Sequence, residues 1–438
     1  MKTRKKILGL VGLLASAKAF TLKNPSSTTL ALSASPNNVV LQPSTDEDAF
    51  DSFKVGSARI HRYSREDDDD STTEYVMWYH GRSKTMQNEK GKNIPPLSTG
   101  RIGRATSKNG LIWEKDKEGS ASEDAPDVSL GLNTESWWGF DTAHVGLGNV
   151  LLPMSTPAVL TEGGVYIKYY FGGNFEEAPL ADFTDKDLPE ALKDAKIQGM
   201  NMKIGVAVSQ DGKTFGRVEG DDPSGACVVP YRKGDPNIMP DSVPKDMPEE
   251  LYNAWPEVAV NLDGKEGENF IMYYSAMLAE TKEKVIGTAV SSDGFRWTKK
   301  GICLTPDDGT LDEAGCARCC VVRNAVYDED VFSWAEAPGF TMYYEGVSAK
   351  DNKHRILRAT SDDGFTWKKE GMILDIGSEP DAWDHAGVGS PHVLRMDDGS
   401  LRMYYTGQGS DGTTAVGVAK LELGAKQWER EQSVFTFA

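Results

Sequence analysis

"SSDGFRWTKKG" begins at Ser291, and "SDDGFTWKKEG" begins at Ser361. Weaker versions of the same phrase are "SKNGLIW" from Ser107 and "SQDGKTF" from Ser209. In each phrase the Asp or Asn can hydrogen-bond to the backbone two residues on, and the following Gly accepts a positive φ angle. The phrase therefore predicts a tight turn, and the aromatic residue after it begins a new strand.

An aromatic segment precedes each of these turns, and a fifth, degenerate copy lies near the C-terminus. The segments are "YVMWYHG" from Tyr75, "VYIKYYFGG" from Val165, "FIMYYSAM" from Phe270, "FTMYYEGVS" from Phe340 and "LRMYYTGQG" from Leu401. Short alternating runs bounded by Gly, Asp and Asn predict β-strands joined by turns. Five ordered copies of one unit indicate a repeat architecture rather than a β-sandwich.

A further strand precedes each aromatic segment, in a frame that opens with an acid and closes with a branched aliphatic residue. Four copies open with Asp: "DSFKVGSARI" from Asp51, "DTAHVGLGNV" from Asp141, "DEAGCARCCV" from Asp312 and "DHAGVGSPHV" from Asp384. The third copy, "EELYNAWPEV", has Glu249 at the Asp position. Because the copies share this acid, we interpret it as mainly structural.

Each unit thus has four predicted strands, and four-stranded repeats arranged radially form a β-propeller. The sequence predicts an all-β fold, a five-bladed β-propeller of four-stranded blades preceded by a targeting presequence. The propeller is expected over residues 48–438. The predicted blades span residues 48–120, 140–220, 249–303, 312–373 and 384–438.

The N-terminal segment differs from the rest of the chain. Met1–Lys6 is basic and Ile7–Ala17 is apolar, with a small-x-small cleavage pattern at its end, so residues 1–19 are predicted to be a signal peptide. Residues 20–45 are rich in Ser and Thr and contain no acid, which is typical of a disordered transit peptide. With Phe20 at the new N-terminus, the two segments resemble the plastid presequence of algae with complex plastids. We expect a plastid protein without membrane insertion after presequence removal; secretion is the alternative.

Composition excludes some classes of partner. The 438 residues include 66 acidic and 48 basic ones, a formal net charge of -18 that repels the phosphates of nucleic acids. The five cysteines are an odd, sparse set that does not suggest a disulfide framework. "CARCC" lacks the second spaced pair of a zinc site, so we predict no metal and no cofactor. Zinc binding, redox sensing and buried packing stay open for Cys316, Cys319 and Cys320.

The first strands of a propeller line its central channel, so positions that vary among them are the best candidates for a specific function. The residues just before the closing aliphatic residue are Arg59, Asn149, Glu257, Cys320 and His392, and those two places earlier are Ser57, Leu147, Trp255, Arg318 and Ser390. A carboxylate, guanidinium groups and an imidazole are costly to gather in a dry place unless they pair or bind a ligand. A water-filled channel with structural ion pairs is the alternative interpretation.

Tryptophans lie in or just before several first strands. Flat aromatic faces beside hydrogen-bonding groups suit a sugar pocket. We therefore predict a small carbohydrate or glycan as the partner. The predicted substrate-binding residues are Arg59, Asn149, Arg318, His392, Trp138, Trp255 and Trp383.

The "SPHV" first strand and the "MYY" second strands resemble those of glycoside hydrolase families 43, 32 and 68, the arabinanase, invertase and levansucrase group. The resemblance runs through all five units and is closest to plant and algal plastid members of undefined activity. It implies three catalytic carboxylates, two of them Asp residues that precede Pro in first strands. The strands ending in "GSARI" and "GLGNV" contain neither Asp nor Pro, so the usual triad is not intact.

A hydrolase would therefore use other carboxylates. Glycoside hydrolysis needs a proton donor and a carboxylate that attacks the sugar or activates water. We predict Glu257 as the acid, Asp141 as the base or nucleophile and Asp384 as an orienting carboxylate. Two functions stay open: a glycosidase acting on a plastid glycan or oligosaccharide, and a catalytically inactive propeller that binds a sugar, a metabolite or a protein partner.

Overall fold

The computed structural model describes residues 38–67, 70–83, 99–117, 127–152, 165–184, 188–238, 242–261, 264–330 and 333–431. Within these ranges the chain is all-β and has no α-helix; two short 3₁₀-helices are η2 (Leu180–Phe183) and η3 (Glu190–Leu192). No helix of the described part is long and apolar enough to cross a membrane. The predicted signal peptide and the transit-like segment up to residue 37 lie outside the described residues.

Each repeat of the sequence forms one antiparallel set of strands, called here units 1 to 5. Unit 1 contains β2 (Lys54–Asp67), β3 (Asp70–Arg82), β4 (Arg101–Ser107) and β5 (Glu114–Lys115), with β6 (Val128–Leu130) beside β4. Unit 2 contains β7 (His144–Leu151), β8 (Tyr166–Gly173), β11 (Lys203–Ser209) and β12 (Gly216–Val218). Unit 3 contains β13 (Glu250–Val260), β14 (Phe270–Leu278), β15 (Lys284–Ser291) and β16 (Thr298–Leu304). Unit 4 contains β17 (Gly315–Asp328), β18 (Ser333–Val347), β19 (His354–Ser361) and β20 (Lys368–Leu374). Unit 5 contains β21 (Gly387–Arg395), β22 (Leu401–Gln408), β23 (Thr414–Leu421) and β24 (Glu429–Arg430).

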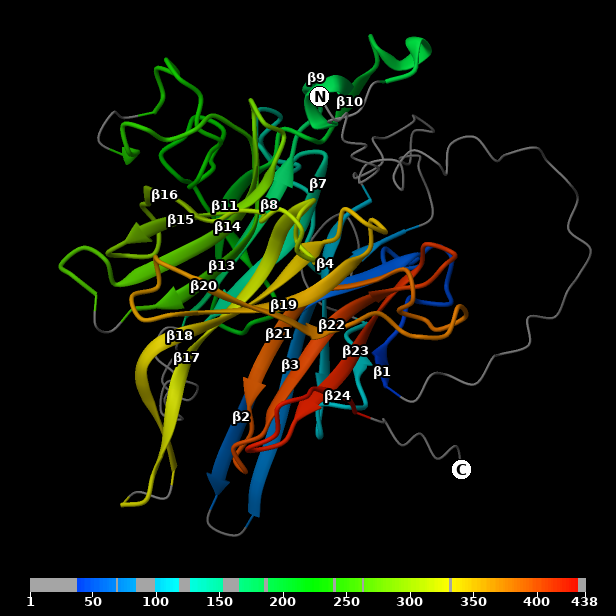
Figure 1. Ribbon diagram of the computed structural model, residues 1–438, viewed down its shortest axis with the longest axis vertical. Coiled ribbons are helices and arrows are strands. Elements are labelled where there is room, and N and C mark those ends of the chain that lie inside the picture. The colour runs from blue at the N-terminus through cyan, green and yellow to red at the C-terminus, as the bar shows by residue number, and fades with distance from the viewer. Residues whose placement is uncertain are drawn as a thin grey trace, which may run out of the picture.

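Contacts between the units follow one circular order. The first strands contact one another in the order β2, β7, β13, β17, β21 and back to β2. Figure 1 shows the long hairpins β2–β3 and β17–β18 extending to one side of the molecule, away from β9 (Glu177–Pro179) and β10 (Lys196–Gln198). Because the pairs are antiparallel, the starts of the first strands and the ends of the second strands meet at the end opposite the hairpin tips.

The Ser-x-Asp-Gly phrase is a turn between the third and fourth strands, as the sequence predicts. In unit 3, Ser291 Oγ accepts the Gly294 N–H at 2.8 Å. Asp293 Oδ1 accepts the N–H groups of Phe295 and Arg296 at 2.8 and 2.9 Å. Gly294 has a φ of 82°, where a side chain would be strained. The turn is therefore determined by local chemistry.

The same turns also join neighbouring units. The carbonyl of the turn glycine accepts a tyrosine hydroxyl from the second strand of the preceding unit. These bonds run from Tyr169 to Gly294 (3.1 Å), from Tyr273 to Gly364 (2.9 Å) and from Tyr404 to Gly110 (2.9 Å). Each turn thus stabilises the packing of one unit on the next, in addition to reversing the chain.

The acid that opens each first-strand frame is a structural anchor. In four units it accepts a hydrogen bond from a second-strand tyrosine and pairs with a Lys or Arg of the fourth strand. The four sets are Asp51–Tyr79–Lys115, Asp141–Tyr170–Arg217, Asp312–Tyr344–Lys369 and Asp384–Tyr405–Arg430. These contacts agree with the structural interpretation of the shared acid.

Unit 3 departs from the frame that residue counting predicts. Glu250, not Glu249, takes the anchoring position: it is buried and pairs with Lys299, whereas Glu249 is exposed and accepts the Lys233 N–H at 2.9 Å. The segment from the anchor to the closing aliphatic residue is one residue shorter in unit 3 than in the other units, and the β13–β14 ladder shifts register between Glu250 and Tyr252. The prediction for Glu249 was wrong because a bulge of this kind leaves no local pattern in the sequence.

The fold begins before the predicted boundary at residue 48. Strand β1 (Val39–Leu41) is buried and pairs with β23 of unit 5, and the Asn38 side chain donates to the Tyr405 hydroxyl at 2.7 Å. The disorder expected for residues 20–45 is therefore wrong for this strand. Its apolar side chains cover the edge of unit 5, which explains why they are ordered.

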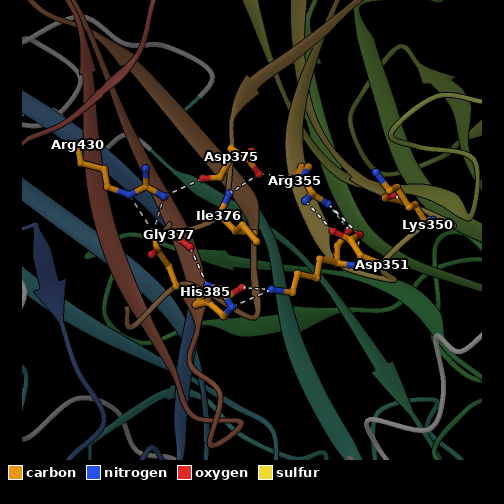
Figure 2. Close-up of polar contacts among 11 residues, drawn as sticks. Lys350, Asp351, Arg355, Asp375, Ile376, Gly377, His385 and Arg430 are labelled. Atoms are coloured by element: carbon orange, nitrogen blue, oxygen red, sulfur yellow. Dashed lines mark hydrogen bonds and ion pairs between the residues drawn. The ribbon is translucent and has the colours of Figure 1, made fainter. Parts of the chain in front are cut away.

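A polar network joins units 4 and 5 (Figure 2). Lys353 donates to the His385 carbonyl at 3.0 Å, and Arg430 donates to the Asp375 carbonyl at 2.7 Å. Arg355 pairs with the Asp375 carboxylate at 2.9 Å. The network holds the loop between β20 and β21 against the start of β19.

Candidate functional site

The five side chains predicted just before the closing aliphatic residues form a layer called here the axial ring. Its members are Arg59, Asn149, Glu257, Cys320 and His392. Four of them hydrogen-bond to the backbone of the next unit. The backbone partner is the residue that directly follows the axial-ring residue of that next unit. The contacts are Asn149 Nδ2 to Val258 O (3.0 Å), Val321 N to Glu257 Oε1 (3.3 Å), Val393 N to Cys320 Sγ (3.4 Å) and His392 Nε2 to Ile60 O (3.0 Å). The structure thus brings these predicted residues together and uses them to tie each first strand to the next.

Arg59 departs from this pattern and crosses the axis. His61, which was not among the predicted residues, makes the link to unit 2, with Nε2 2.8 Å from the Val150 carbonyl. The Arg59 guanidinium lies 3.3 Å from Glu257 Oε2 and donates to the Pro391 carbonyl at 3.2 Å. An ion pair therefore fills the centre of the ring.

Glu257 has the acidity of a proton donor but little access to solvent. Its side chain is 5% exposed. Burial raises its pKa to about 7, although Arg59 and the Val321 N–H both favour the charged form. A carboxyl group with this pKa is protonated in mildly acidic solution.

We expect the stability of Glu257→Gln relative to the wild type to rise with pH. Because the pKa of Glu257 is raised in the folded state, its protonation stabilises the folded wild type, fully so below the ordinary pKa of 4.5. This stabilisation is lost as the pH rises through about 7. At about 1.36 kcal/mol per pKa unit, the free energy of unfolding of the variant minus that of the wild type should increase by about 3 kcal/mol between pH 4 and pH 8. Urea unfolding at both pH values measures the shift. A constant difference would mean that Glu257 titrates as it does in an unfolded chain.

Outside the axial ring, four first strands carry a non-glycine residue in the left-handed region of backbone conformation. These residues, called here the mouth layer, are Ser57 (φ 48°), Trp255 (φ 49°), Arg318 (φ 46°) and Ser390 (φ 47°). Each lies where the ladder between first and second strand shifts register. Such conformations cost about 1–3 kcal/mol each and are concentrated at functional sites. These positions were among those predicted from the sequence, but the residue types did not reveal their conformation.

The second strands supply side chains to the mouth layer. The residue after the two aromatic residues of each second strand is, from unit 1 to unit 5, His80, Phe171, Ser275, Glu345 and Thr406. Three of these side chains accept the backbone N–H of the mouth-layer residue in the next unit. The bonds are Ser57 N to Thr406 Oγ1 (2.9 Å), Arg318 N to Ser275 Oγ (2.9 Å) and Ser390 N to Glu345 Oε2 (3.0 Å). These positions also vary within a constant segment, and that signal could have identified them in the sequence.

Glu345 is the carboxylate of the mouth, and it was not among the residues predicted from the sequence. Its Oε1 lies 2.8 Å from Arg318 Nη1 and 2.5 Å from His354 Nδ1. Burial alone would raise its pKa, but Arg318 and His354 together hold the pKa at about 2. The charged carboxylate orients both partners, whose side chains are 32% and 35% exposed. A ligand at the mouth can therefore meet a guanidinium and an imidazole in fixed positions.

Trp255 provides an aromatic surface beside these groups. Its half-buried ring has the Arg318 guanidinium 4.3 Å from its centroid and the Phe171 ring centroid at 4.8 Å. The structure thus brings two of the predicted substrate-binding residues, Trp255 and Arg318, into contact. Together they form a flat apolar face bordered by N–H donors.

Two other predicted tryptophans have different surroundings. Trp138 is 53% exposed in the loop before β7 and meets Trp137 edge-on, with centroids 5.9 Å apart. Trp383 packs on Tyr405 and donates to Asn38 Oδ1 at 3.1 Å. It also lines a pocket of about 380 Å³ between the residues 39–43 and the loop of residues 409–415.

Asp141 and Asp384 are both anchors of the first-strand frame, and each is 1% exposed. Among the described residues, no hydrogen bond or ion pair joins either aspartate to Glu257. The structure therefore does not bring the three predicted catalytic carboxylates into contact. Their catalytic roles stay predictions.

No group of three or more His, Cys, Asp or Glu side chains in the described ranges is arranged to hold a metal ion. All five cysteines are free thiols, and Cys316, Cys319 and Cys320 are buried. Burial raises the pKa of each of these three thiols, so they are protonated at neutral pH. The geometry supports a packing role for them.

No family model matches the chain. The chain is 32% and 31% identical, over 163 residues, to uncharacterized proteins of Mycobacterium tuberculosis strains CDC 1551 and H37Rv. Each match covers 36% of this chain and 48% of the relative, so the chain spans about half the length of the curated relatives it matches.

Solved structures resemble the chain over most of its length. A BT0996 RGII complex has a TM-score of 0.53 at 16% identity, with 90% of this chain and 95% of the similar one covered. A β-1,2-mannobiose phosphorylase from Listeria innocua, in complex with β-1,2-mannobiose, has a TM-score of 0.53 at 11% identity, with 88% and 94% covered. A structure from the glycoside hydrolase family 130 of mannoside phosphorylases has a TM-score of 0.50 at 13% identity, with 93% and 99% covered. At these identities the likeness shows the fold, which is that of propeller-type glycosidases.

Proposed function

We propose that this protein is a five-bladed β-propeller that binds a carbohydrate at the mouth of its central axis. The five antiparallel units and the circular order of first-strand contacts support the number of blades. The observation that carries the function is the Trp255 face with the Arg318 guanidinium 4.3 Å from its centroid. Stacking on an aromatic face, with hydrogen-bonding groups at its edge, is a common way to bind a sugar ring.

The other groups of the mouth also suit a sugar. Hydroxyl groups both donate and accept hydrogen bonds, so a sugar needs partners of both kinds. Arg318 supplies donors, and the exposed part of His354, held through Nδ1 by Glu345, offers its second ring nitrogen. The similar solved structures that are named for glycans or glycan-active enzymes add support from outside the chain.

The burial of the predicted catalytic carboxylates favours a sugar-binding function over a hydrolytic one. In most glycoside hydrolases two carboxyl groups flank the bond that is cleaved. Here Glu257 is 5% exposed and paired with Arg59, and the anchors Asp141 and Asp384 are 1% exposed. The second candidate function, a glycosidase with Glu257 as the acid, is favoured by one observation, because a pKa of about 7 suits a general acid.

A glycan array probed with the full chain tests the proposed function. We expect at least one oligosaccharide to bind, and calorimetric titration of that ligand to give a saturable isotherm. If the folded protein binds no glycan on the array or in titration, the proposal is wrong.

Hydrolysis is tested on a panel of aryl glycosides with the wild type and Glu257→Gln. Loss of a general acid costs about 10²–10⁴-fold in rate. Turnover that falls by such a factor in a folded Glu257→Gln variant would support the second candidate. Equal turnover in the two proteins would remove Glu257 from the mechanism.

Two finer proposals accompany this function. The "SPHV" and "MYY" motifs support a relationship to glycoside hydrolase families 43, 32 and 68, and the composition of residues 1–45 supports a plastid location. A metabolite or a protein remains the alternative ligand of a catalytically inactive propeller.

A further inference from the structure

Two cations on one side of the mouth have no ion-pair partner among the described residues. Lys54 and Arg82 lie directly opposite each other in the β2–β3 ladder, where like charges repel. Both side chains are partly buried, and within the described ranges neither makes an ion pair. Arg318, on β17, is the third cation of this region, and we call the three residues the basic side.

The three cations are close enough to perturb one another. Burial, together with Arg82 and Arg318, lowers the pKa of Lys54 to about 8, while Asp411 acts in the opposite direction. Burial and Arg318 lower the pKa of Arg82 to about 10. Partly buried like charges are unfavourable for folding, and groups perturbed in this way are concentrated at functional sites. The cluster also stands out in a chain with a net charge of -18.

Two histidines beside the basic side have unused ring nitrogens. His144 Nε2 lies 2.7 Å from the Gly199 carbonyl, to which it donates, and the buried Nδ1 has no partner. His80 Nε2 is also buried without a partner. Burial lowers the pKa of both rings, which are therefore neutral at pH 7. In this tautomer His144 Nδ1 is an acceptor, so the two histidines add no positive charge to that of the neighbouring cations.

The basic side is continuous with the aromatic face. The Phe171 ring centroid is 6.3 Å from that of His80, 6.2 Å from that of His144 and 4.8 Å from that of Trp255. Arg318 belongs to both surfaces, because its guanidinium lies over the Trp255 ring. A sugar that stacks on Trp255 would thus place a charged substituent among the cations.

We propose that the basic side binds an oxyanion carried by the glycan that stacks on Trp255. The inference rests on the proposed function and adds the class of ligand, an acidic sugar with a carboxylate or phosphate group. Lys54 and Arg82 neutralise the anion, and Arg318, which is already paired with Glu345, supplies further N–H donors. The anion supplies Lys54 and Arg82 with the counter-charge that the described residues do not provide.

Calorimetric titration of the full chain with matched probes tests this inference. The carboxylate pair is trigalacturonate and neutral galactotriose, and the phosphate pair is glucose 6-phosphate and glucose, with inorganic phosphate alone as a further probe. We expect at least one acidic probe to bind about 10-fold or more tightly than its neutral match, because hydrogen bonds to a charged acceptor are stronger than those to a neutral one. The preference should weaken as the salt concentration rises.

Variants connect the preference to the basic side. Arg82→Gln and, separately, Lys54→Gln should reduce affinity for the acidic probe about 10-fold and leave the neutral probe unchanged. Two variants are used so that misfolding of one does not end the test. Arg296→Gln is the matched control, since Arg296 is 74% exposed in the turn at the other end of unit 3. It should keep the preference.

The possible outcomes separate the inference from the proposed function. Equal affinity for acidic and neutral probes overturns the inference and leaves carbohydrate binding intact. Failure of all four sugar probes to bind overturns the inference, and the proposed function is overturned as well only if the glycan array also shows no binding. Inorganic phosphate that binds as tightly as glucose 6-phosphate would show that the anion need not be carried by the glycan, which also overturns the inference.

Discussion

Replacing Lys299 with Met is expected to lower the free energy of unfolding by about 3–5 kcal/mol. The Lys299 and Glu250 side chains are 7% and 0% exposed and form an ion pair, and Lys299 Nζ also donates to Asn253 Oδ1 at 2.8 Å. Removing the cation leaves the Glu250 charge buried without a counter-ion, which is the costly outcome. Urea unfolding at pH 7, followed by tryptophan fluorescence, measures the change.

The neighbouring lysine provides the control. Lys300 pairs with Glu268 at the surface, with 38% of the lysine side chain exposed, so Lys300→Met should cost less than about 1 kcal/mol. The double variant Glu250→Gln/Lys299→Met should recover part of the loss because no buried charge remains unpaired. If Lys299→Met costs no more than Lys300→Met, Glu250 is not an anchor of unit 3.

Trp255→Ala should weaken glycan binding about 30-fold or more. A central aromatic residue at an interface contributes about 2 kcal/mol or more to binding, and each 1.4 kcal/mol is a factor of ten. The change removes the flat surface and leaves the Arg318 guanidinium, now 4.3 Å from the ring centroid, without its aromatic support. Calorimetric titration with the tightest oligosaccharide from the array measures the loss.

Trp297 is the matched control for this prediction. It belongs to the same unit but lies after the turn at the opposite end, where its ring packs on Tyr169 with centroids 5.8 Å apart. Trp297→Ala should lower the melting temperature and leave the affinity of the folded protein unchanged. Similar loss of affinity in both variants would place the binding site away from the mouth.

The repeat was visible in the sequence because every copy needs the same local chemistry. Asp293 accepts the N–H groups of residues two and three places on, and Gly294 takes a φ of 82°, so the turn is specified within a few residues. The anchoring acid was predictable for the same reason in four units. In unit 3 the bulge after Glu250 shifted the frame by one residue, and only the strand pairing reveals it.

The candidate site was predicted only in part. Variation among the first strands selected Trp255 and Arg318, which do lie together, but it also selected Asn149 and His392, which bond to the backbone of the next unit. Comparison of the second strands by the same criterion was needed to find Glu345. The start of β19 has no such pattern, so His354 could not be found from the sequence.

The sequence by itself determined the repeating unit, its turn and the set of first-strand positions that vary. These features follow from local hydrogen bonding and from the period-two alternation of strands. Only the tertiary structure decided which of those side chains are committed to the fold and which are available to a ligand. It placed Glu257 against Arg59 and left Arg318 over Trp255 at the mouth. Both contacts join residues of different units, and no local pattern of the chain encodes them.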